Sequence, residues 1–305
     1  MRVILSNWKQ WDYSYSMQDR ADMAKTARAE IAMKGSDGTV IYGPNTWYRF
    51  KTPPYKGKSN DNLELVCKQS NNRVKVQLWC FPYLRYHQGS ANAINEAIAR
   101  WNPDDVDLDI EGYWAKDYPE YTGPFLRSLG QVNVRFWLQS YRIPSYHPQI
   151  QWEKLLSYKD VNGRYIIHGL APQAYPIQSH DFVRDYARMV AEYDKLTTKV
   201  GRPDMPWFPT MPTFTEKGWT PTVNDMIAGC DFLIKELGER LIGFNFWRQD
   251  YLFQPDWKPI LTYINTLSSQ EPPPPPVIPQ NEYIHDHLHP WAVTEGYSGP
   301  NPDVV

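Results

Sequence analysis

The sequence predicts an α/β protein, a (β/α)8 TIM barrel followed by a proline-rich C-terminal extension. Strand-like and helix-like segments alternate eight times within the first 267 residues, which is the count and the length of such a barrel. A doubly wound sheet is the alternative, but no glycine-rich phosphate-binding turn follows the first strand-like segment. Five consecutive prolines begin at Pro272. We therefore expect a barrel over residues 1–268 and a proline-rich linker with a tail over residues 269–305.

The expected strands are short segments rich in apolar and β-branched residues, and turn residues bound them. In chain order they are residues 3–7, 39–42, 74–81, 104–111, 132–140, 165–175, 207–212 and 241–247. The seventh contains prolines, which cannot donate to the hydrogen-bond ladder of a sheet.

The expected helices follow these strands one by one. They are residues 17–34, 62–69, 91–101, 119–129, 152–157, 181–196, 222–237 and 255–267. Ser16 with Asp19 is a capping pattern at the start of the first helix. Ile94 and Ile98 lie on one apolar stripe of the third helix, and Gly238 stands just past the end of the seventh.

The fourth expected strand carries an unusual concentration of charge. Acidic and apolar residues alternate there with the period of a β-strand; the acids are Asp107, Asp109 and Glu111, and the apolar residues are Val106, Leu108 and Ile110. An antiparallel strand with its acidic face in water would also explain the pattern. The alternation with helices instead predicts a strand buried on both faces, where aligned carboxylates push their pKa values apart. We therefore expect a functional site on this strand.

Composition argues against several classes of partner. The net charge is −2 and the pI is about 6.4, so neither a nucleic acid nor an anionic membrane surface is expected as a partner. No apolar run approaches the ~20 residues that cross a bilayer, so no membrane insertion is expected. The N-terminal residues do not resemble a signal peptide. We expect synthesis in the cytoplasm, with release by lysis or carriage on a virion if the protein leaves the cell.

The cysteines do not indicate a disulfide framework or a zinc site. Cys67, Cys80 and Cys230 have no C-x-x-C spacing, and their number is odd. The histidines give no better metal site, because His87, His147, His168 and His180 show no convergent spacing. A metal-dependent barrel hydrolase is therefore disfavoured.

Aromatic residues are abundant and fall after the expected strands. The chain has 13 Trp and 21 Tyr. Those at or after strand ends are Trp8, Trp11, Trp47, Trp79, Tyr83, Tyr113, Trp114, Tyr141, Tyr175, Trp247 and Tyr251. In a barrel, the residues that follow the strands surround the active-site mouth. Aromatic rings around Glu111 predict a sugar-binding cleft, because ring faces bury C–H surface while polar edges stay wet.

Three short motifs resemble those of the family 18 glycosidases, which are the chitinases and endo-β-N-acetylglucosaminidases. Residues 104–111 read D-D-V-D-L-D-I-E against the family's D-G-x-D-x-D-x-E, with Asp105 in place of the glycine. Residues 173–175 read Q-A-Y against M-x-Y, and residues 243–247 read G-F-N-F-W against G-x-x-x-W. The family's third-strand S-x-G-G is absent, because residues 78–81 read L-W-C-F.

A second, weaker resemblance is to the family 25 lysozymes of bacteria and phages. These barrels have a D-x-E on an inner strand, which Asp109 and Glu111 match. Their first strand carries an acid where this chain has Ile4, which counts against an unchanged family 25 mechanism. Both families cleave polymers that contain N-acetylglucosamine. The two resemblances therefore imply a chitin- or peptidoglycan-type substrate.

The family 18 resemblance implies a role for each site residue. Glu111 would be the general acid and then the general base, Asp109 would orient the 2-acetamido group of the substrate, and Asp107 would hold Asp109 by sharing a proton. Tyr175 would bind the acetamido oxygen, and Trp247 would form the floor under the sugar. The other expected substrate-binding residues are Trp114, Tyr113, Trp79, Tyr141 and Gln173. The chemistry needs neither a metal nor an organic cofactor.

A different hypothesis is a barrel with reduced chemistry that serves as a carbohydrate-binding or structural module on a virion or a cell surface. The missing S-x-G-G, Gln173 and the tail are all compatible with it. The tail has no helical or strand period, and its alternate histidines between residues 285 and 289 are explained by a polar loop better than by a metal site. We expect the tail to be a docking arm that forms a homo- or hetero-oligomer. Packing of the tail on its own barrel is the alternative.

Overall fold

The computed structural model describes most of residues 1–269. The described ranges are 1–7, 17–34, 76–82, 84–101, 103, 105–112, 118–129, 134–176, 181–214, 219–247 and 249–269. They belong to one compact unit, Met1–Pro273. The expected helix at 62–69, the expected strand at 39–42, and the tail from residue 270 with its docking role lie outside the described residues.

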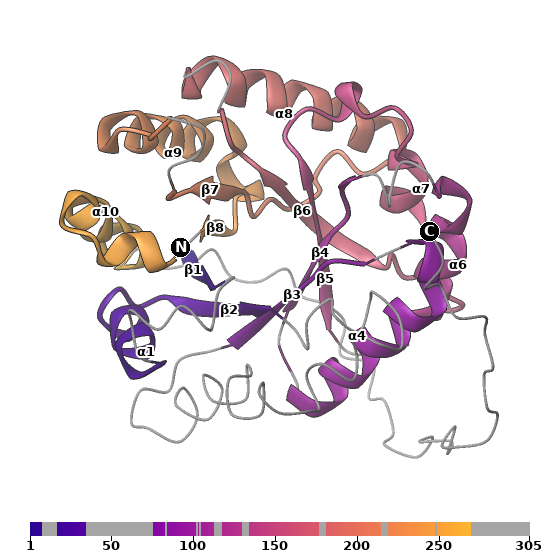
Figure 1. Cartoon of the computed structure of the whole chain (residues 1–305). Helices are drawn as coiled ribbons and strands as arrows, with labels where there is room; N and C mark the ends of the chain where they lie inside the picture. The colour runs from indigo at the N-terminus through magenta and orange to yellow at the C-terminus, as the bar shows by residue number, and fades with distance from the viewer. Residues whose placement is uncertain are drawn as a thin grey trace, which may run out of the picture. The chain divides into compact units, whose positions relative to one another are not determined.

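The described strands form a closed parallel barrel in chain order. They are β1 (Arg2–Asn7), β2 (Glu30–Lys34), β3 (Val76–Cys80), β4 (Asp105–Asp109), β5 (Arg135–Tyr141), β6 (Ile167–Gln173), β7 (Thr210–Pro212) and β8 (Gly243–Trp247). The ring closes where β8 pairs with β1, with Arg2 opposite Gly243 and Ser6 opposite Trp247. A parallel α/β barrel was expected from the sequence, and the structure confirms it (Figure 1).

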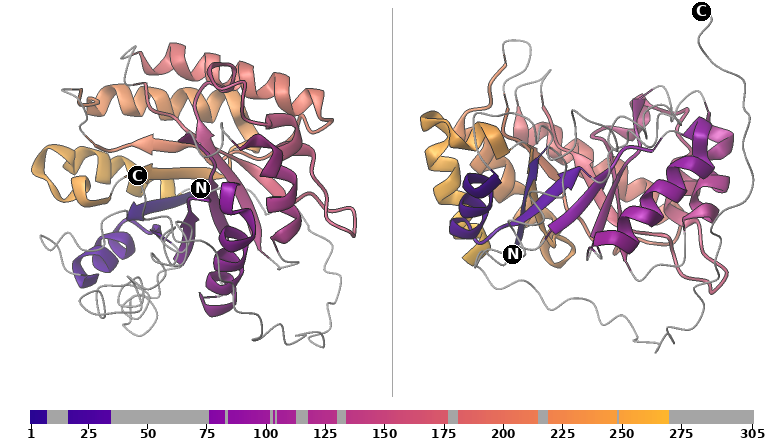
Figure 2. Two further views of the ribbon diagram at one scale, coloured as in Figure 1. Left: turned by 45° about the vertical axis from the view of Figure 1, so that its right-hand side comes forward. Right: turned by 60° about the horizontal axis from the view of Figure 1, so that its bottom comes forward.

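Helices surround the strands in each view (Figure 2). Those described are α1 (Met17–Thr26), α4 (His87–Trp101), α6 (Thr122–Ser128), α7 (Trp152–Ser157), α8 (Phe182–Lys199), α9 (Val223–Leu237) and α10 (Lys258–Ser269). Asp181 caps α8 by accepting from the backbone N–H of Arg184, and Thr222 caps α9 through the N–H of Asp225. None of the described helices has the length and apolar character that a membrane crossing requires.

The second strand lies earlier in the chain than the sequence predicts. Residues 17–34 were expected to form one helix, but α1 ends at Thr26 and Glu30–Lys34 pairs with both β1 and β3. Arg28 has a φ of 52°, and the N–H groups of Arg28 and Ala29 donate to the carbonyls of Lys25 and Ala24. This is a Schellman ending, which glycine usually marks. An arginine in the left-handed position hides the end of the helix from sequence inspection.

A tryptophan fills the interior of the barrel. Trp137 on β5 is 1% exposed and packs with Ile4, Ala171 and Phe208. A side chain at Gly169 on the neighbouring strand would collide with the Trp137 ring, so this glycine makes room for the tryptophan. Ile4 is therefore an apolar packing residue at the place where family 25 lysozymes carry an acid.

Asp105, which replaces the glycine of the family 18 motif, is neutralised inside the barrel. It is 1% exposed, and its carboxylate accepts from Arg2 Nη2 at 2.6 Å, Arg135 Nε at 2.7 Å and Trp137 Nε1 at 3.0 Å. Two arginines and an indole N–H thus compensate for the burial of a charge. The interaction joins β1, β4 and β5 below the level of the expected site.

We predict that Asp105→Asn lowers the free energy of unfolding by about 3 kcal/mol. The substitution leaves two largely buried guanidinium groups without their shared counter-ion, and loss of one partner from a buried pair typically costs about 3–5 kcal/mol. Urea unfolding measures the difference. The control is Glu153→Gln, which removes the exposed ion pair with Lys199 and should cost no more than about 1 kcal/mol. Equal effects of the two substitutions would contradict the role given to Asp105.

Candidate active site

The acidic strand β4 is buried on both faces. Val106, Leu108 and Ile110 are fully buried in the core under the helices. Asp107 and Asp109 are 2% and 3% exposed on the opposite, inward face. The alternative of an antiparallel strand with its acidic face in water is therefore wrong. In a barrel strand, alternate residues face the interior. Glu111 comes two residues after the strand, at its C-terminal end, and is partly exposed.

Burial raises the pKa of Asp109 well above its usual range, and the charges of Glu111 and Asp107 raise it further. Hydrogen bonds from the Gln173 and Trp79 side chains oppose this rise. Gln173 Nε2 lies 3.1 Å from Asp109 Oδ1. Asp109 therefore keeps a proton at pH values at which an isolated aspartic acid has lost it.

Two side chains of β5 fix the turn that carries Glu111. Ser140 Oγ donates to the carbonyl of Ile110 at 2.5 Å, and Tyr141 accepts at its hydroxyl from the N–H of Gly112 at 2.8 Å. The Tyr141 ring stacks on His147 with centroids 3.4 Å apart. Ser140 and Tyr141 thus hold the backbone on the two sides of Glu111, and the expected contact of Tyr141 with substrate stays a prediction. Sequence reasoning missed Ser140.

Two of the expected tryptophans meet at the same end of the barrel. Trp79 is the second-last residue of β3, and Trp247 is the last residue of β8. Their ring centroids are 5.8 Å apart. Trp79 is 4% exposed and also interacts with Asp109. Trp79 thereby lies between Asp109 and Trp247, the residue expected to form the floor under the sugar.

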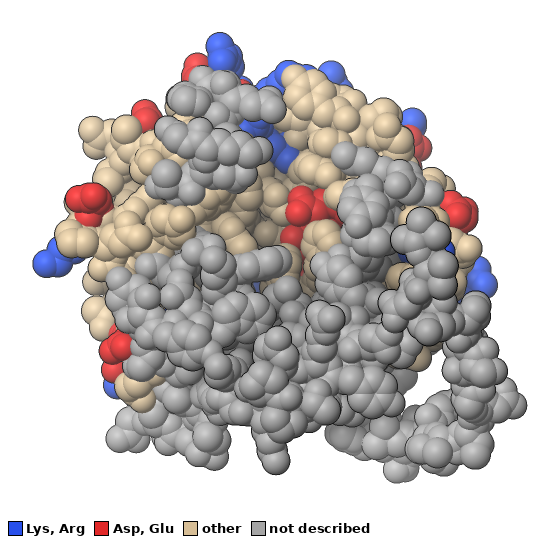
Figure 3. Space-filling model, viewed as in Figure 1, with Lys and Arg blue, Asp and Glu red and all other residues tan. Residues whose placement is uncertain are grey.

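Tyr175 lies at this end too, two residues after β6. Its ring meets Phe214 edge-on at a centroid distance of 5.2 Å. Tyr113 and Trp114, which were also expected to bind substrate, lie outside the described residues. Figure 3 shows acidic atoms near the centre of the face that Figure 1 presents.

Buried polar residues on other strands were not found from the sequence. The members of this set are Gln77, Gln139, Thr210 and Asn245, each at most 1% exposed. Gln139 Nε2 donates to Thr210 Oγ1 at 3.2 Å. The available signal was a polar residue in the middle of an otherwise apolar strand, which a buried strand tolerates only with a hydrogen-bond partner.

Metal chemistry has no support among the described residues. In that part of the chain, no three His, Cys, Asp or Glu side chains form a group that could hold a metal ion. His87 stacks on Tyr121, and burial lowers the pKa of His168 to about 4, with a further lowering by Arg135.

Solved structures that align with this chain include family 18 enzymes. A GH18 chitinase from Pseudoalteromonas aurantia aligns with a TM-score of 0.52 and 14% identity, over 87% of this chain and 100% of that one. A family 18 chitinase from Crocus vernus gives 0.53 and 12%, over 88% and 100%. A fungal endo-beta-N-acetylglucosaminidase of glycosyl hydrolase family 18 gives 0.53 and 15%, over 88% and 97%. The fold is that of a family 18-like barrel.

This likeness is one of fold. No protein-family model matches the sequence, and no curated protein matches it. The resemblance inferred from the three motifs is thus confirmed for the family 18-like barrel, while the chemistry has to be argued from the residues of this chain.

We predict that Asp109→Asn stabilises the protein more at neutral than at acidic pH. Because the pKa is raised in the folded state, the native protein binds more protons than the unfolded chain above the ordinary aspartate pKa of 3.8, and stability falls as pH rises through that window. The amide removes this loss. Melting scans from pH 3.5 to 7.5 should show the variant gaining on the wild type as pH rises. A stability gain that becomes smaller as pH rises would contradict the raised pKa of Asp109. The control is Asp256→Asn, which changes an exposed carboxylate.

Proposed function

We propose that the protein is a retaining glycoside hydrolase that cleaves a polymer containing N-acetylglucosamine, with Glu111 as general acid and base. The observation that carries the proposal is the position of Glu111. It follows β4 at the C-terminal end of a parallel barrel, two residues after a buried carboxyl group with a raised pKa. The family 18 fold of the neighbours, which include a chitinase in complex with (GlcNAc)4, supports the substrate class.

The proposed first step breaks the glycosidic bond. Glu111 gives its proton to the leaving oxygen while the acetamido oxygen of the substrate attacks the anomeric carbon, so the C–O bond to the leaving group breaks as an intramolecular C–O bond forms. Asp109 orients the acetamido N–H, and Tyr175 donates to the acetamido oxygen. In the second step Glu111 takes a proton from water, which opens the cyclic intermediate with net retention.

The environment of Asp109 suits this role. Its raised pKa lets Asp109 and Asp107 hold one proton between them before the substrate binds. The growing positive charge on the acetamido group then favours the ionised form of Asp109. The amide of Gln173, 3.1 Å away, fixes the orientation of the carboxylate during this change.

A carbohydrate-binding or structural module is the second candidate. The observation that favours it is the packing at the end of β3, where Leu78, Cys80 and Phe81 stand at the small positions of the S-x-G-G motif. Between them, Trp79 lies against Asp109 and Trp247. A large side chain beside the carboxylate reduces the room for a distorted sugar ring. Hydrolysis of peptidoglycan by a family 25 mechanism is less favoured, because Ile4 is buried in an apolar cluster.

We predict that Glu111→Gln lowers turnover of the best substrate by about 10²–10⁴-fold and leaves oligosaccharide affinity nearly unchanged, because the amide keeps the shape of the acid and has no proton to transfer. Chitin, peptidoglycan and a glycoprotein glycan are the substrates to compare. Glu120→Gln, at an exposed position between β4 and α6, is the matched control and should keep full activity. Binding without hydrolysis by the wild-type protein would favour the module.

We also predict that a thiazoline analogue of the cyclised intermediate inhibits the enzyme competitively, and that polymers of plain glucose are not cleaved. Both results follow from the use of the acetamido oxygen as nucleophile. Steady-state kinetics with the analogue and with cellulose oligosaccharides tests this. Cleavage of glucose polymers at a comparable rate would refute substrate participation even if Glu111 were essential.

A further inference from the structure

The backbone next to Tyr175 is joined to the neighbouring strand through the N–H of Ala174, which donates to the carbonyl of Thr210 at 2.9 Å. The neighbouring strand β7 has three residues and pairs with β6 at Gln173 and Thr210, with one isolated bridge between Leu170 and Trp207. Pro209 lies between the paired residues Trp207 and Thr210, and Pro212 ends β7; neither proline has an N–H to donate. The chain after Gln173 therefore needs other partners to hold its carbonyl groups.

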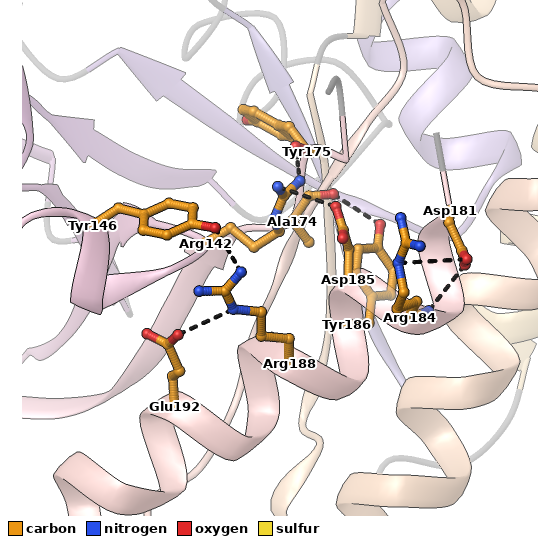
Figure 4. A network of polar contacts seen from close by, with 10 residues as sticks. All are labelled: Arg142, Tyr146, Ala174, Tyr175, Asp181, Arg184, Asp185, Tyr186, Arg188 and Glu192. Carbon is orange, nitrogen blue, oxygen red and sulfur yellow. Dashed lines mark hydrogen bonds and ion pairs between the residues drawn. The ribbon is translucent and has the colours of Figure 1, made fainter. Parts of the chain in front are cut away.

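Side chains from outside the sheet supply these partners. The hydroxyl of Tyr186 on α8 donates to the carbonyl of Ala174 at 2.8 Å. Arg142, the residue after β5, donates from Nη1 to the carbonyl of Tyr175. Two successive carbonyls are thus fixed by two different elements, as Figure 4 shows.

Arg142 is held in turn by an ion pair with α8. Its Nη2 lies 3.0 Å from Asp185 Oδ2, and the two side chains are 14% and 12% exposed. Burial lowers the pKa of Arg142 and the charge of Asp185 opposes this effect, so the guanidinium stays charged at physiological pH. A planar guanidinium can serve a carbonyl and a carboxylate at a fixed angle, which a lysine ammonium cannot do with the same geometry.

The loop that carries Arg142 is attached to the same helix. Glu192 on α8 accepts from the N–H and the hydroxyl of Ser145 at 2.9 and 2.8 Å. Arg188 donates to Glu192 at 3.2 Å and to the hydroxyl of Tyr146 at 2.5 Å. Helix α8 therefore sets the relative position of the chain segments that leave β5 and β6, and Arg142 is the side chain that connects them (Figure 4).

We propose that Arg142, paired with Asp185, is a positioning residue of the glycosidase, which fixes the carbonyl of Tyr175 and so the point from which the Tyr175 hydroxyl meets the acetamido group. This inference rests on the proposed function. Arg142 does not touch the substrate; it acts through Tyr175. Loss of Arg142 leaves the hydrogen bond between Tyr186 and Ala174 in place, so the segment after β6 keeps one of its two supports while Tyr175 loses its fixed position.

The test is a double-mutant cycle between Arg142 and Tyr175. We expect Arg142→Ala to lower kcat by about 10–10²-fold with KM changed no more than about twofold, because a displacement of about 1 Å at a catalytic group costs up to that much. Arg142→Lys should recover part of the loss, since it keeps one of the two contacts. In a Tyr175→Phe background, Arg142→Ala should have almost no further effect on kcat.

A merely structural role would give a different result. If Arg142 only stabilises the fold, its effect on kcat will be the same with Tyr175 or Phe at position 175, and this outcome overturns the proposal. Arg184→Ala is the matched control, because Arg184 is an exposed arginine of the same helix whose ion pair is with Asp181. It should leave kcat unchanged.

The cycle also separates this proposal from the proposed function. If the wild-type protein hydrolyses none of the polymers, the glycosidase proposal fails. The wild type, the two single variants and the double variant of the cycle are then compared by calorimetric affinity for chitotetraose. Coupling between Arg142 and Tyr175 in that affinity would support positioning of the acetamido contact. Independent effects, or no binding of chitotetraose at all, would refute it.

Discussion

The period of two residues along β4 is the constraint on which the rest of the structure depends. It places Asp105, Asp107, Asp109 and Glu111 on one inward face, where carboxylates are costly. The protein meets that cost in a different way at each level. Arginines neutralise the deepest acid, a shared proton is the proposed solution for the middle pair, and partial exposure to solvent serves the acid at the mouth. A gradient of environments along one strand thus separates a structural acid, Asp105, from the acids to which we assign proposed chemical roles.

Much of the fold could be predicted from the sequence, because most segments combine a clear period with end signals. The helix after Thr222 shows this well, since a capping threonine begins it and Gly238 ends it. The prediction for the second strand was wrong because the sequence pattern there was ambiguous. The segment from Ala24 to Lys34 has good helix formers throughout, and only the left-handed conformation of Arg28 ends the helix. Pairing with β1 and β3 then decides in favour of a strand, and no local pattern contains that information.

For the candidate site, the sequence supplied the acids and several aromatic residues but not the interactions between them. The partners of Asp105 could not be predicted, since Arg2 is 103 residues away in the chain. The hydrogen bond from the N–H of Gly112 to the Tyr141 hydroxyl could not be predicted either, because the position of Tyr141 after a strand says nothing about its partner. Position in a barrel predicts which residues reach the mouth. The direction in which each side chain points depends on packing that appears only when the ring is closed.

The short seventh strand has a consequence for the dynamics of the barrel. Where prolines interrupt a ladder, fewer backbone hydrogen bonds have to break for a local opening. The seam between β6 and β7 is paired at Gln173 and Thr210 and at the isolated bridge between Leu170 and Trp207, so it opens at a lower free-energy cost than a fully paired seam. This seam lies directly beside Tyr175. Local fluctuations there would change the position of Tyr175 long before they changed the global stability of the fold. Helix α8 holds the backbone on the β6 side, so it limits the motions of the segment that carries Tyr175 as well as fixing its position.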